Sequence, residues 1–360
     1  MNVLIIGNGF DLAHNLPTSY MDFMNYLDFC HAVNVNPEIL KYIRHGNDAN
    51  STWENLNDKL KKLIFDWVSS GRKDELLSHN IYKLLNQRNC WYEYFADEIK
   101  NNKLSKKNWV DFESKIAIVV KCLEDIIQRK VANHYIKDNR VSILPLVASK
   151  TIVGFDKGFE YDYINCIRRD LELFIKCLDE YITIVGQIKL FEKEKLGCID
   201  NIDVDRLVSF NYTETYSKLY KPIDSSCIDY AHGKAGEADK EDISNLVLGC
   251  EETLQGDLIN TITQCGYFKK YLQRDVKATG RMYRKFYEEC TSGDNVLYIF
   301  GHSLDINDGD IIKYMIDKSE KIVIYYWNID DVVNKAQNLV RIMTKEGYEN
   351  ARWKIEFREQ

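Results

Sequence analysis

Four short polar motifs hold most of the groups in this chain that could do chemistry, and each follows an apolar run. They are Gly7-Asn8-Gly9-Phe10-Asp11, Ser209-Phe210-Asn211-Tyr212-Thr213, Ala231-His232-Gly233-Lys234 and Phe300-Gly301-His302-Ser303-Leu304-Asp305. Their carboxylate, amide and imidazole groups could bind a polar ligand and transfer protons. If the apolar runs are parallel strands, the motifs meet at the carboxyl edge of one sheet, where open α/β sheets bind ligands. The four motifs together therefore predict a ligand site.

The first motif has features of a nucleotide-binding turn. Residues 3–6 are apolar on both faces, which is typical of a central strand in a parallel sheet. Gly7 and Gly9 would let the backbone turn sharply and approach a ligand closely. The amides from Gly7 to Phe10 and the start of a following helix could then hold a pyrophosphate.

The dinucleotide fingerprint is nevertheless incomplete. Leu12 stands where its third glycine belongs. Asp28 has the spacing expected of a ribose-binding acid, but it falls in residues 20–29, whose apolar stripe predicts a helix. A hydride-transferring Rossmann domain is therefore disfavoured.

Each motif also has a purely structural interpretation, because Asn, Asp and Ser are favoured at helix starts. The alternatives are helix capping by Asp11, by Asn211, by His302-Ser303 or by Asp308, and a turn position for His232. Near the first motif, His14 could line the pocket, and Thr18 or Ser19 could cap the next helix. The other histidines are expected to be surface or packing residues.

Composition excludes several classes of protein. The chain has 360 residues, of which 45% are hydrophobic, and a net charge of −7, which argues against a protein that coats nucleic acid. No apolar run reaches 18 residues and no signal peptide is visible, so we expect no membrane span and a cytoplasmic location. The ten cysteines form no C-x-x-C pair, so we expect reduced packing residues and no metal site.

The pattern along the chain predicts a parallel α/β sheet interrupted by helices. Expected strands cover 3–6, 207–210, 228–231, 246–248, 296–300 and 322–326, and expected helices cover 53–68, 76–85, 109–127 and 161–188, with Gly186 as a candidate interruption. We therefore expect a Rossmann-like core of residues 1–34 plus 203–360. A large all-helical insertion, residues 35–202, would follow the first βα unit.

The motifs resemble those of a known family. GNGFDLAHNLPTSY, SFNYTETYSKLY, YAHGKAG, LVLGCEE and IFGHSLDINDGDII, together with WVDFES in the insertion, are similar to the AbiH family of bacterial abortive-infection, phage-defence proteins. More remotely, the order of strand-end motifs resembles that of sirtuin-like NAD-binding domains, which have a glycine loop, then an Asn, a His-Gly and a Gly-x-Ser.

The sirtuin-like resemblance implies roles for individual residues. Asn211 would be the pocket asparagine and His232 the catalytic histidine, and Asp11 would join them in catalysis. The implied NAD-binding residues are Gly7, Asn8, Gly9, Phe10, Tyr212, Gly301, His302, Ser303 and Asn328, the last of them at the adenine end. This chain cannot build the four-cysteine zinc module of sirtuin deacylases, so the resemblance points to NAD hydrolysis instead.

NAD hydrolysis would make modest demands on the site. The pyridinium departs as neutral nicotinamide, so no general acid is required, in contrast to ordinary glycosidases. By the resemblance, Asn211 would hold a water or the nicotinamide ribose, and His232 would accept a proton from that water or from a ribose hydroxyl. Asp11 would stabilise positive charge on the ribose.

Two other functions stay open at this stage. The chain could be a non-catalytic nucleotide sensor, with the insertion as a platform for homo-oligomerisation or for a phage-derived trigger. It could also bind nucleic acid through residues 268–287, where cations alternate with aromatic residues. The simpler interpretation of that segment is a helix pair with basic outer faces and an aromatic inner stripe. A nuclease is disfavoured, because Glu251-Glu252 and Asp305, Asp308 and Asp310 are poorly spaced for a metal.

Overall fold

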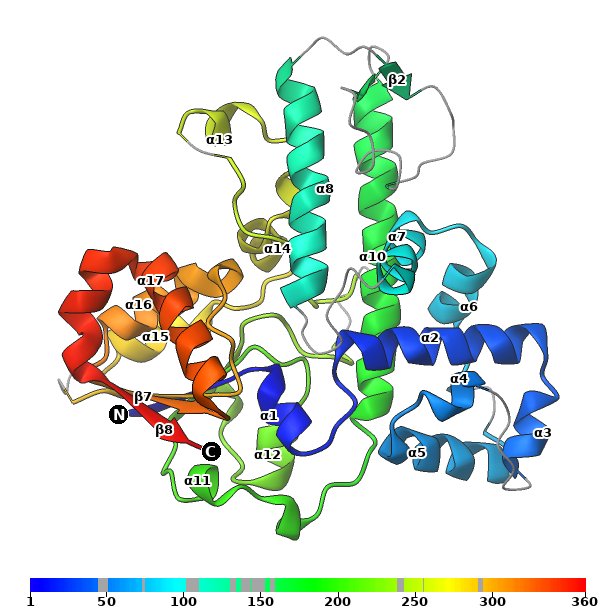
Figure 1. Cartoon of the computed structure of the whole chain (residues 1–360). Helices are drawn as coiled ribbons and strands as arrows, with labels where there is room; N and C mark the ends of the chain where they lie inside the picture. Colours follow the sequence, from blue (N-terminus) through cyan, green and yellow to red (C-terminus); the bar gives the residue numbers. More distant parts are fainter. Residues whose placement is uncertain are drawn as a thin grey trace. The chain divides into compact units, whose positions relative to one another are not determined.

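The structure is a computed structural model in which the chain divides into two compact units (Figure 1). The first unit comprises Met1–Thr18, Ile182–Glu237 and Lys277–Gln360, and the second comprises Ser19–Tyr181 and Ala238–Val276. The structure describes residues 1–44, 51–72, 75–101, 110–129, 134–136, 143, 153–155, 159–237, 243–254, 256–290 and 294–360. The expected boundaries of the core and of the insertion stay a prediction.

A six-stranded parallel sheet forms the centre of the first unit, which confirms the expected α/β class. Its strands are β1 (Asn2–Ile6), β4 (Arg206–Ser209), β5 (Ile228–Tyr230), β6 (Val296–Phe300), β7 (Lys321–Tyr326) and β8 (Ile355–Glu359). Their spatial order is β5-β4-β1-β6-β7-β8, so the order reverses at β1. In register, Leu4 of β1 lies between Leu207 and Tyr298 of its two neighbours.

Successive side chains of β1 point to opposite faces of the sheet, and both faces are covered by apolar residues. Val3 and Ile5 pack in one buried cluster, whereas Leu4 and Ile6 pack in another. The helices of this unit are α1 (Asn8–Ala13), α11 (Gly197–Asp200), α12 (Thr215–Leu219), α15 (Met282–Glu288), α16 (Gly309–Asp317) and α17 (Ile329–Ala351). Short 3-10 turns, η2 (Glu192–Glu194), η3 (Ser225–Cys227), η5 (Ile306–Asp308) and η6 (Arg352–Lys354), join them.

Strand predictions differ from the structure at β8 and at residues 246–248. Strand β8 was missed because it is an edge strand with charged residues at alternate positions, which gives it no apolar run. Residues 246–248 were expected to form a strand but form none. They are fully buried, and the Gln273 side chain satisfies both backbone groups of Leu248, accepting from its N–H at 3.0 Å and donating to its carbonyl at 2.9 Å. A side chain thus replaces the neighbouring strand.

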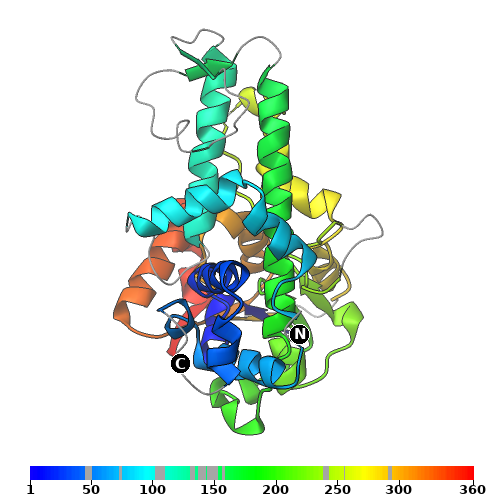
Figure 2. The same cartoon turned by 90° about the vertical axis from the view of Figure 1, so that its right-hand side faces the viewer.

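The second unit is mostly helical, and its two longest helices, α8 and α10, lie side by side (Figures 1 and 2). The Phe112 and Phe174 rings join them at a centroid distance of 5.7 Å. The helices are α2 (Tyr20–Val35), α3 (Ile39–Arg44), α4 (Ser51–Glu54), α5 (Asp58–Ser69), α6 (His79–Asn86), α7 (Cys90–Lys100), α8 (Val110–Arg129), α10 (Phe159–Val185), α13 (Leu258–Thr261) and α14 (Lys270–Val276). The unit also contains η4 (Gly266–Phe268) and a parallel pair of strands, β2 (His134–Ile136) and β3 (Val153–Phe155). The expectation that the insertion, residues 35–202, is all-helical was therefore wrong, because these short strands give no long apolar run in the sequence.

Local capping explains where several helices begin. Ser19 and Asp22 form a capping box at the start of α2, as expected. The expected helix 53–68 is broken, because the Asn57 side chain caps α5 by accepting from the Lys59 N–H at 2.9 Å. Gly186 follows the end of α10 directly. Residue 109, the expected start of α8, lies outside the described residues, as does His45.

Two further observations complete the fold. No helix in the described ranges is long and apolar enough to cross a membrane. The ten cysteines are free thiols, and five of them are buried: Cys30, Cys90, Cys177, Cys250 and Cys265. Burial raises the pKa of Cys30 and Cys250 to about 12, so these thiols are protonated packing residues.

Candidate functional site

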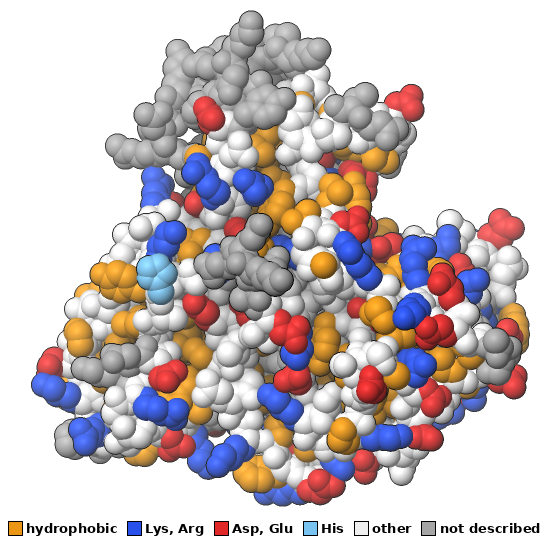
Figure 3. Space-filling view, turned by 180° about the vertical axis from the view of Figure 1, so that it is seen from behind, with side chains coloured by type: hydrophobic (Ala, Val, Ile, Leu, Met, Phe, Trp, Pro, Cys, Tyr) orange, Lys and Arg blue, Asp and Glu red, His pale blue; other side chains and the backbone are white. Residues whose placement is uncertain are grey.

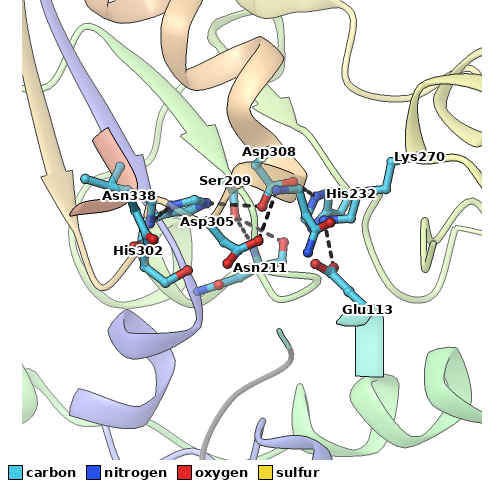
Figure 4. Close-up of polar contacts among 12 residues, drawn as sticks. Glu113, Ser209, Asn211, His232, Lys270, His302, Asp305, Asp308 and Asn338 are labelled. Carbon is cyan, nitrogen blue, oxygen red and sulfur yellow. Dashed lines mark hydrogen bonds and ion pairs between the residues drawn. The ribbon is translucent and has the colours of Figure 1, made fainter. Parts of the chain in front are cut away.

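The four polar motifs follow β1, β4, β5 and β6, which are neighbours in the sheet. Because all four strands are parallel, the motifs lie together at its carboxyl edge, and this edge holds the point where the strand order reverses. Figure 4 shows His302, Asn211, Ser209, His232 and Asp308 gathered there. The four motifs therefore meet at one edge of the sheet, as expected, and ligand binding at that edge stays a prediction.

The glycines of the first motif let two loops pack backbone against backbone. The Gly7 N–H donates to the Phe300 carbonyl at 3.0 Å, and the Gly9 N–H donates to the Gly301 carbonyl at 2.8 Å. A Cβ on Gly9 would lie 2.8 Å from the Gly301 Cα, and one on Gly301, whose φ is +66°, would lie 2.2 Å from the Phe10 nitrogen. Only glycine fits at these positions, because backbone meets backbone.

This packing corrects the predicted phosphate cradle. The Phe10 N–H donates to the Gly7 carbonyl at 2.8 Å, so the amides of Gly7, Gly9 and Phe10 are all bonded inside the protein. The Phe10 ring is fully buried in the core with Leu4 and Ile6. These three amides and this ring therefore do not face a ligand.

Three other side chains at this edge carry buried polar atoms to which none of the described residues hydrogen-bonds. They are Asn8, Asp11 and Asn211, of which Asp11 is 1% and Asn211 4% exposed. Within the described part of the chain, no hydrogen bond reaches Asn8 Nδ2, Asp11 Oδ1 or either side-chain polar atom of Asn211. Buried polar atoms are nearly always satisfied, so each of these needs an explanation. A ligand with both donors and acceptors would supply their partners.

One oxygen of Asn8 and one oxygen of Asp11 accept hydrogen bonds that hold these two side chains in place. Asn8 Oδ1 accepts from the Thr18 hydroxyl at 2.8 Å, and Asp11 Oδ2 accepts from the Thr213 hydroxyl at 2.7 Å. Thr213 and Thr215 exchange a further hydroxyl contact of 2.9 Å. Asn8 and Asp11 are therefore each held by a threonine hydroxyl, and Asn8 Nδ2 and Asp11 Oδ1 are left for a ligand.

Burial makes the Asp11 carboxyl unusually basic. Desolvation raises its pKa from 3.8 to about 6, although the hydroxyls of Thr213 and Thr215 and the nearby amide of Asn211, which is too poorly aligned for a hydrogen bond, oppose the shift. The group is therefore ionised above neutral pH and protonated in mild acid. A perturbed carboxyl next to unsatisfied amides is typical of functional sites.

Neither Asp11 nor Asn211 is a helix cap, so that alternative is wrong for both. Helix α1 begins after Gly7 without a side-chain cap, and α12 begins after Glu214, also without one. The backbone of Asn211 is fixed instead by Ser209, whose hydroxyl donates to the Asn211 carbonyl at 3.1 Å.

A second cluster joins two histidines through one carboxylate. His232 Nε2 lies 2.8 Å from Asp308 Oδ1, and His302 Nε2 lies 3.5 Å from Asp308 Oδ2. All three residues are buried, with exposures of 5% to 6%. The Phe210 ring packs edge-on against both imidazoles, with centroid distances of 5.2 and 4.3 Å. An oriented imidazole of this kind can accept a proton.

From the sequence, Asp308 is a candidate helix cap or a poorly spaced metal-binding carboxylate, and its contact with the two histidines is not predicted. Asp308 precedes α16 but makes no capping hydrogen bond there. Asp305 instead caps η5, accepting from the Asn307 N–H at 3.0 Å. His302-Ser303 is not the cap of α16 either. The spacing to His232 along the chain gave no signal, because the contact spans 76 residues.

The loop after β6 has an unusual backbone. Leu304 has a φ of +56° although it is fully buried, and its N–H donates to His302 Nδ1 at 2.9 Å. Positive φ is costly for a leucine and marks functional sites when it occurs. Ser303 is exposed, and its carbonyl accepts from Asn338 Nδ2 at 3.0 Å.

Other predicted residues have mainly structural contacts. His14 bonds through Nδ1 to the Phe10 carbonyl at 2.6 Å and through Nε2 to the Tyr220 hydroxyl at 2.8 Å, so it does not line the site. Asn328 is exposed and caps α17, accepting from the Asp331 N–H at 2.9 Å. Tyr212 lies near the site, with its ring centroid 6.3 Å from that of His232.

A hollow lies beside the Asp11 cluster. It is small, with a cavity volume of about 10 Å³, and is partly open to solvent. Its apolar walls come from Leu16, Val185, Ile188 and Leu190, its backbone edge from Gly186, and its polar groups from Thr213, Glu214, Thr215 and Lys218. Thr213 and Thr215 thus separate this hollow from the Asp11 carboxylate.

Comparison with known proteins identifies the family. The family model described as "Bacteriophage abortive infection AbiH" matches residues 3–327. This chain belongs to the AbiH family. It is accordingly a bacteriophage abortive-infection protein, as its motifs suggested. No curated protein and no solved structure matches it.

The basic-aromatic segment of this AbiH protein does not present a row of free cations. Lys269 and Lys270 are 2% and 0% exposed, and they form buried ion pairs with Glu124 at 2.8 Å and Glu113 at 2.7 Å. Arg274 is also buried. The aromatic residues Tyr283, Phe286 and Tyr287 are buried, as the simpler interpretation expected, but its basic outer face is wrong for the buried Lys269, Lys270 and Arg274.

Surface charge in this AbiH protein is mixed in sign. On the face seen in Figure 3, Lys and Arg side chains are interspersed with Asp and Glu side chains. Among the described residues, no group of three or more His, Cys, Asp or Glu side chains could hold a metal ion.

Proposed function

We propose that this AbiH protein binds NAD at the carboxyl edge of its sheet and hydrolyses the bond between nicotinamide and ribose. Loss of NAD would arrest the infected cell. The observation that carries the proposal is the set of buried, unpartnered polar atoms on Asn8, Asp11 and Asn211, next to the oriented imidazole of His232.

The sheet topology supports a dinucleotide ligand. In chain order the strands lie 3-2-1-4-5-6, which is the order of dinucleotide-binding sheets. Such sheets bind their ligand where the order reverses, and here that point is the end of β1. The unpartnered cluster occupies that point. A Rossmann-like, sirtuin-like character is part of this proposal.

The chemistry of the cluster suits the ribose end of NAD. A ribose carries hydroxyls that both donate and accept, and the cluster offers donors on Asn8 and Asn211 and acceptors on Asp11 and Asn211. At neutral pH the Asp11 carboxylate would face the positive charge that develops on the ribose. This charge is one that a preorganised anion stabilises well in a buried site.

The reaction balances with water as the only co-substrate. Water attacks the anomeric carbon, the electron pair of the carbon–nitrogen bond departs with neutral nicotinamide, and His232 accepts a proton from the water. Asn211 orients the water or the ribose through its amide. The products are nicotinamide and ADP-ribose, and the proton on His232 returns to solvent.

Turnover with matched histidine variants tests the proposal. The purified protein is incubated with NAD, and nicotinamide and ADP-ribose are measured over time. His232→Ala should release nicotinamide about 10²–10⁴-fold more slowly than the wild type. His79→Ala removes an exposed histidine and is the control, with an expected rate equal to that of the wild type.

The outcomes separate the candidate functions. Equal loss in the two variants, or turnover that survives in His232→Ala, would remove the histidine from the mechanism. Saturable NAD binding without release would favour a nucleotide sensor, in which the second unit answers to a trigger. Neither binding nor release would refute the NAD proposal altogether.

A further inference from the structure

We propose that strand β8 is a dimerisation edge, at which two copies of this chain pair their β8 strands antiparallel about a two-fold axis. The partner of this edge is thus the same strand of a second copy, and the two sheets join into one. Pairing of this kind requires neither NAD nor turnover, because β8 carries none of the residues of the candidate site.

Strand β8 is an open edge of the six-stranded sheet (Figure 1). It lies last in the strand order, and among the described residues β7 is the only strand that pairs with it. The opposite edge differs, because β5 has only three residues and the Thr279 hydroxyl donates to its Tyr230 carbonyl at 2.8 Å. An open edge presents backbone donors and acceptors to a further strand. Strand β8 is therefore the edge where such a strand can add.

The backbone of β8 alternates between β7 and the open side. In a parallel pair, every second residue directs its backbone groups toward the neighbouring strand. The Gln360 N–H donates to the Tyr326 carbonyl at 3.1 Å, so the even-numbered residues of this strand face β7. The odd-numbered residues, among them Phe357 and Glu359, therefore direct their backbone groups to the open side. The Ile355 N–H is used locally by the Arg352 carbonyl, which leaves the Ile355 carbonyl on that side.

The sequence of β8, Ile-Glu-Phe-Arg-Glu, is complementary to itself in the antiparallel direction. A two-fold axis at Phe357 places this residue opposite its own copy. Glu356 then lies opposite Arg358 of the second copy, and the axis repeats this pair of opposite charges. A shift by one residue in either direction would lose this match, so the charges specify the register.

The backbone directions agree with the same register. Both copies of Phe357 direct their backbone groups outward, so they form a hydrogen-bonded pair across the axis. The Glu359 N–H meets the Ile355 carbonyl of the second copy, which gives about four backbone hydrogen bonds in all. Glu356 and Arg358 fall in the pairs without backbone hydrogen bonds, where opposing side chains come closest.

The side chains of β8 are accessible on both faces. Glu356 pairs with Arg358 at 2.5 Å and with Lys321 of β7 at 3.0 Å, and the Arg358 and Glu356 side chains are 43% and 41% exposed. Exposed pairs of this kind are weak, so they exchange at little cost for pairs across the axis. On the other face, Ile355 and Phe357 pack against the core but are only half-buried. A second Phe357 would extend this apolar layer.

The size of the contact sets the expected affinity. A pair of five-residue strands is a small interface, so we expect a dissociation constant in the micromolar range. A two-fold contact of this kind is closed, because each copy uses the same edge and no further copy can add there. The expected product is a dimer and not a filament.

Charge reversal at positions 356 and 358 tests the register. Sedimentation of the full-length wild type should show a reversible equilibrium between monomer and dimer. In Arg358→Glu each cross-strand pair joins two carboxylates, and in Glu356→Arg each joins two cations. Either change should raise the dissociation constant of the dimer about tenfold or more. Lys285→Glu is the control, with an expected unchanged constant, because it reverses an exposed charge on α15, which contacts β5 at the opposite edge.

Mixing the two charge variants is the most specific test. One variant carries glutamate at both positions and the other carries arginine at both. A mixed dimer therefore restores opposite charges at every cross-strand position. An equimolar mixture of Arg358→Glu and Glu356→Arg should form dimers at least about tenfold more tightly than either variant alone.

A proline at position 359 blocks the edge without changing a charge pair. The Glu359 N–H faces the open side, so Glu359→Pro removes an outward donor and no hydrogen bond to β7. This variant should unfold at a urea concentration close to that of the wild type, and it should sediment as a monomer where the wild type is a dimer. It decides the question even if the charge variants fail to fold.

Three results would overturn this assignment of β8. A wild type that stays monomeric up to millimolar concentration would leave the edge to a strand of a different protein. A dimer that persists in Glu359→Pro and in both charge variants would place the interface elsewhere on the chain. Charge variants that each weaken the dimer but do not associate with one another would reject the antiparallel register about Phe357.

Discussion

Asp11→Asn should make the protein more stable and less active, and the gain in stability should depend on pH. Burial raises the pKa of the Asp11 carboxyl from 3.8 to about 6, so the folded state holds this proton more tightly than the unfolded state does. Stability from this group is therefore present in acid and is lost as pH rises from about 4 to about 6. Above pH 7 the buried charge costs roughly 3 kcal/mol.

The amide variant removes that cost and keeps the local contact. Its side-chain oxygen can still accept from the Thr213 hydroxyl, which now lies 2.7 Å from Asp11 Oδ2. We therefore expect the free energy of unfolding of Asp11→Asn to exceed that of the wild type by about 1–3 kcal/mol at pH 8 and by almost nothing at pH 4. Nicotinamide release at pH 8 should fall, because the carboxylate would no longer face the ribose.

Urea unfolding at pH 4, 6 and 8 measures the effect. Asp317→Asn is the matched control, because Asp317 is an exposed aspartate of the same unit, and its change should stay within about 1 kcal/mol at every pH. A gain for Asp11→Asn that is equal at pH 4 and pH 8, or a loss of stability at pH 8, would refute the assignment of a strained buried charge.

Three further substitutions test other parts of the structure by urea unfolding. Gly301→Ala should lower the free energy of unfolding by about 3 kcal/mol or more, because its Cβ would lie 2.2 Å from a backbone atom. Gly71 also has a positive φ, but a Cβ there would meet no atom within 4 Å, so Gly71→Ala should lower it by only about 1–2 kcal/mol. Equal losses in the two variants would contradict the loop contact. Lys270→Met should lower the free energy of unfolding by about 3–5 kcal/mol, because it removes the cation that lies 2.7 Å from the buried Glu113 carboxylate. Lys345→Met, at an exposed position, should lower it by less than about 0.5 kcal/mol, and similar values for the two variants would show that the buried pair is weak. Asn211→Ala should change the free energy of unfolding by less than about 1 kcal/mol, because no described residue hydrogen-bonds to its side-chain amide. Nicotinamide release by this variant should fall about 100-fold or more. An unfolded variant would show that the amide is structural.

The sequence predicted the elements that place the site better than it predicted the contacts within it. The short apolar runs before Gly7, Asn211 and Gly301 are strong local signals, and the shorter run 228–231 before His232, which contains Asp229, is a weaker one, so both the strands and the shared edge could be predicted from them. Those signals are local because a buried parallel strand must be apolar on both faces.

What the sequence could not reveal depends on long-range contact. Gly7 and Gly9 were read as a ligand cradle, but their space is filled by Gly301, which is almost 300 residues away in the chain. Asp308 resembles any residue that precedes a helix until His232 is placed beside it. Lys269 likewise looked like a surface cation, because nothing local shows that it is paired with a glutamate on α8.

The structure of the His232→Ala variant with NAD would test the central claim most directly. This variant should bind NAD without consuming it. We expect a ribose of NAD within hydrogen-bonding distance of Asn211 and Asp11, at the ends of β1 and β4. NAD bound elsewhere, with the polar atoms of Asn8, Asp11 and Asn211 still unpartnered, would contradict it.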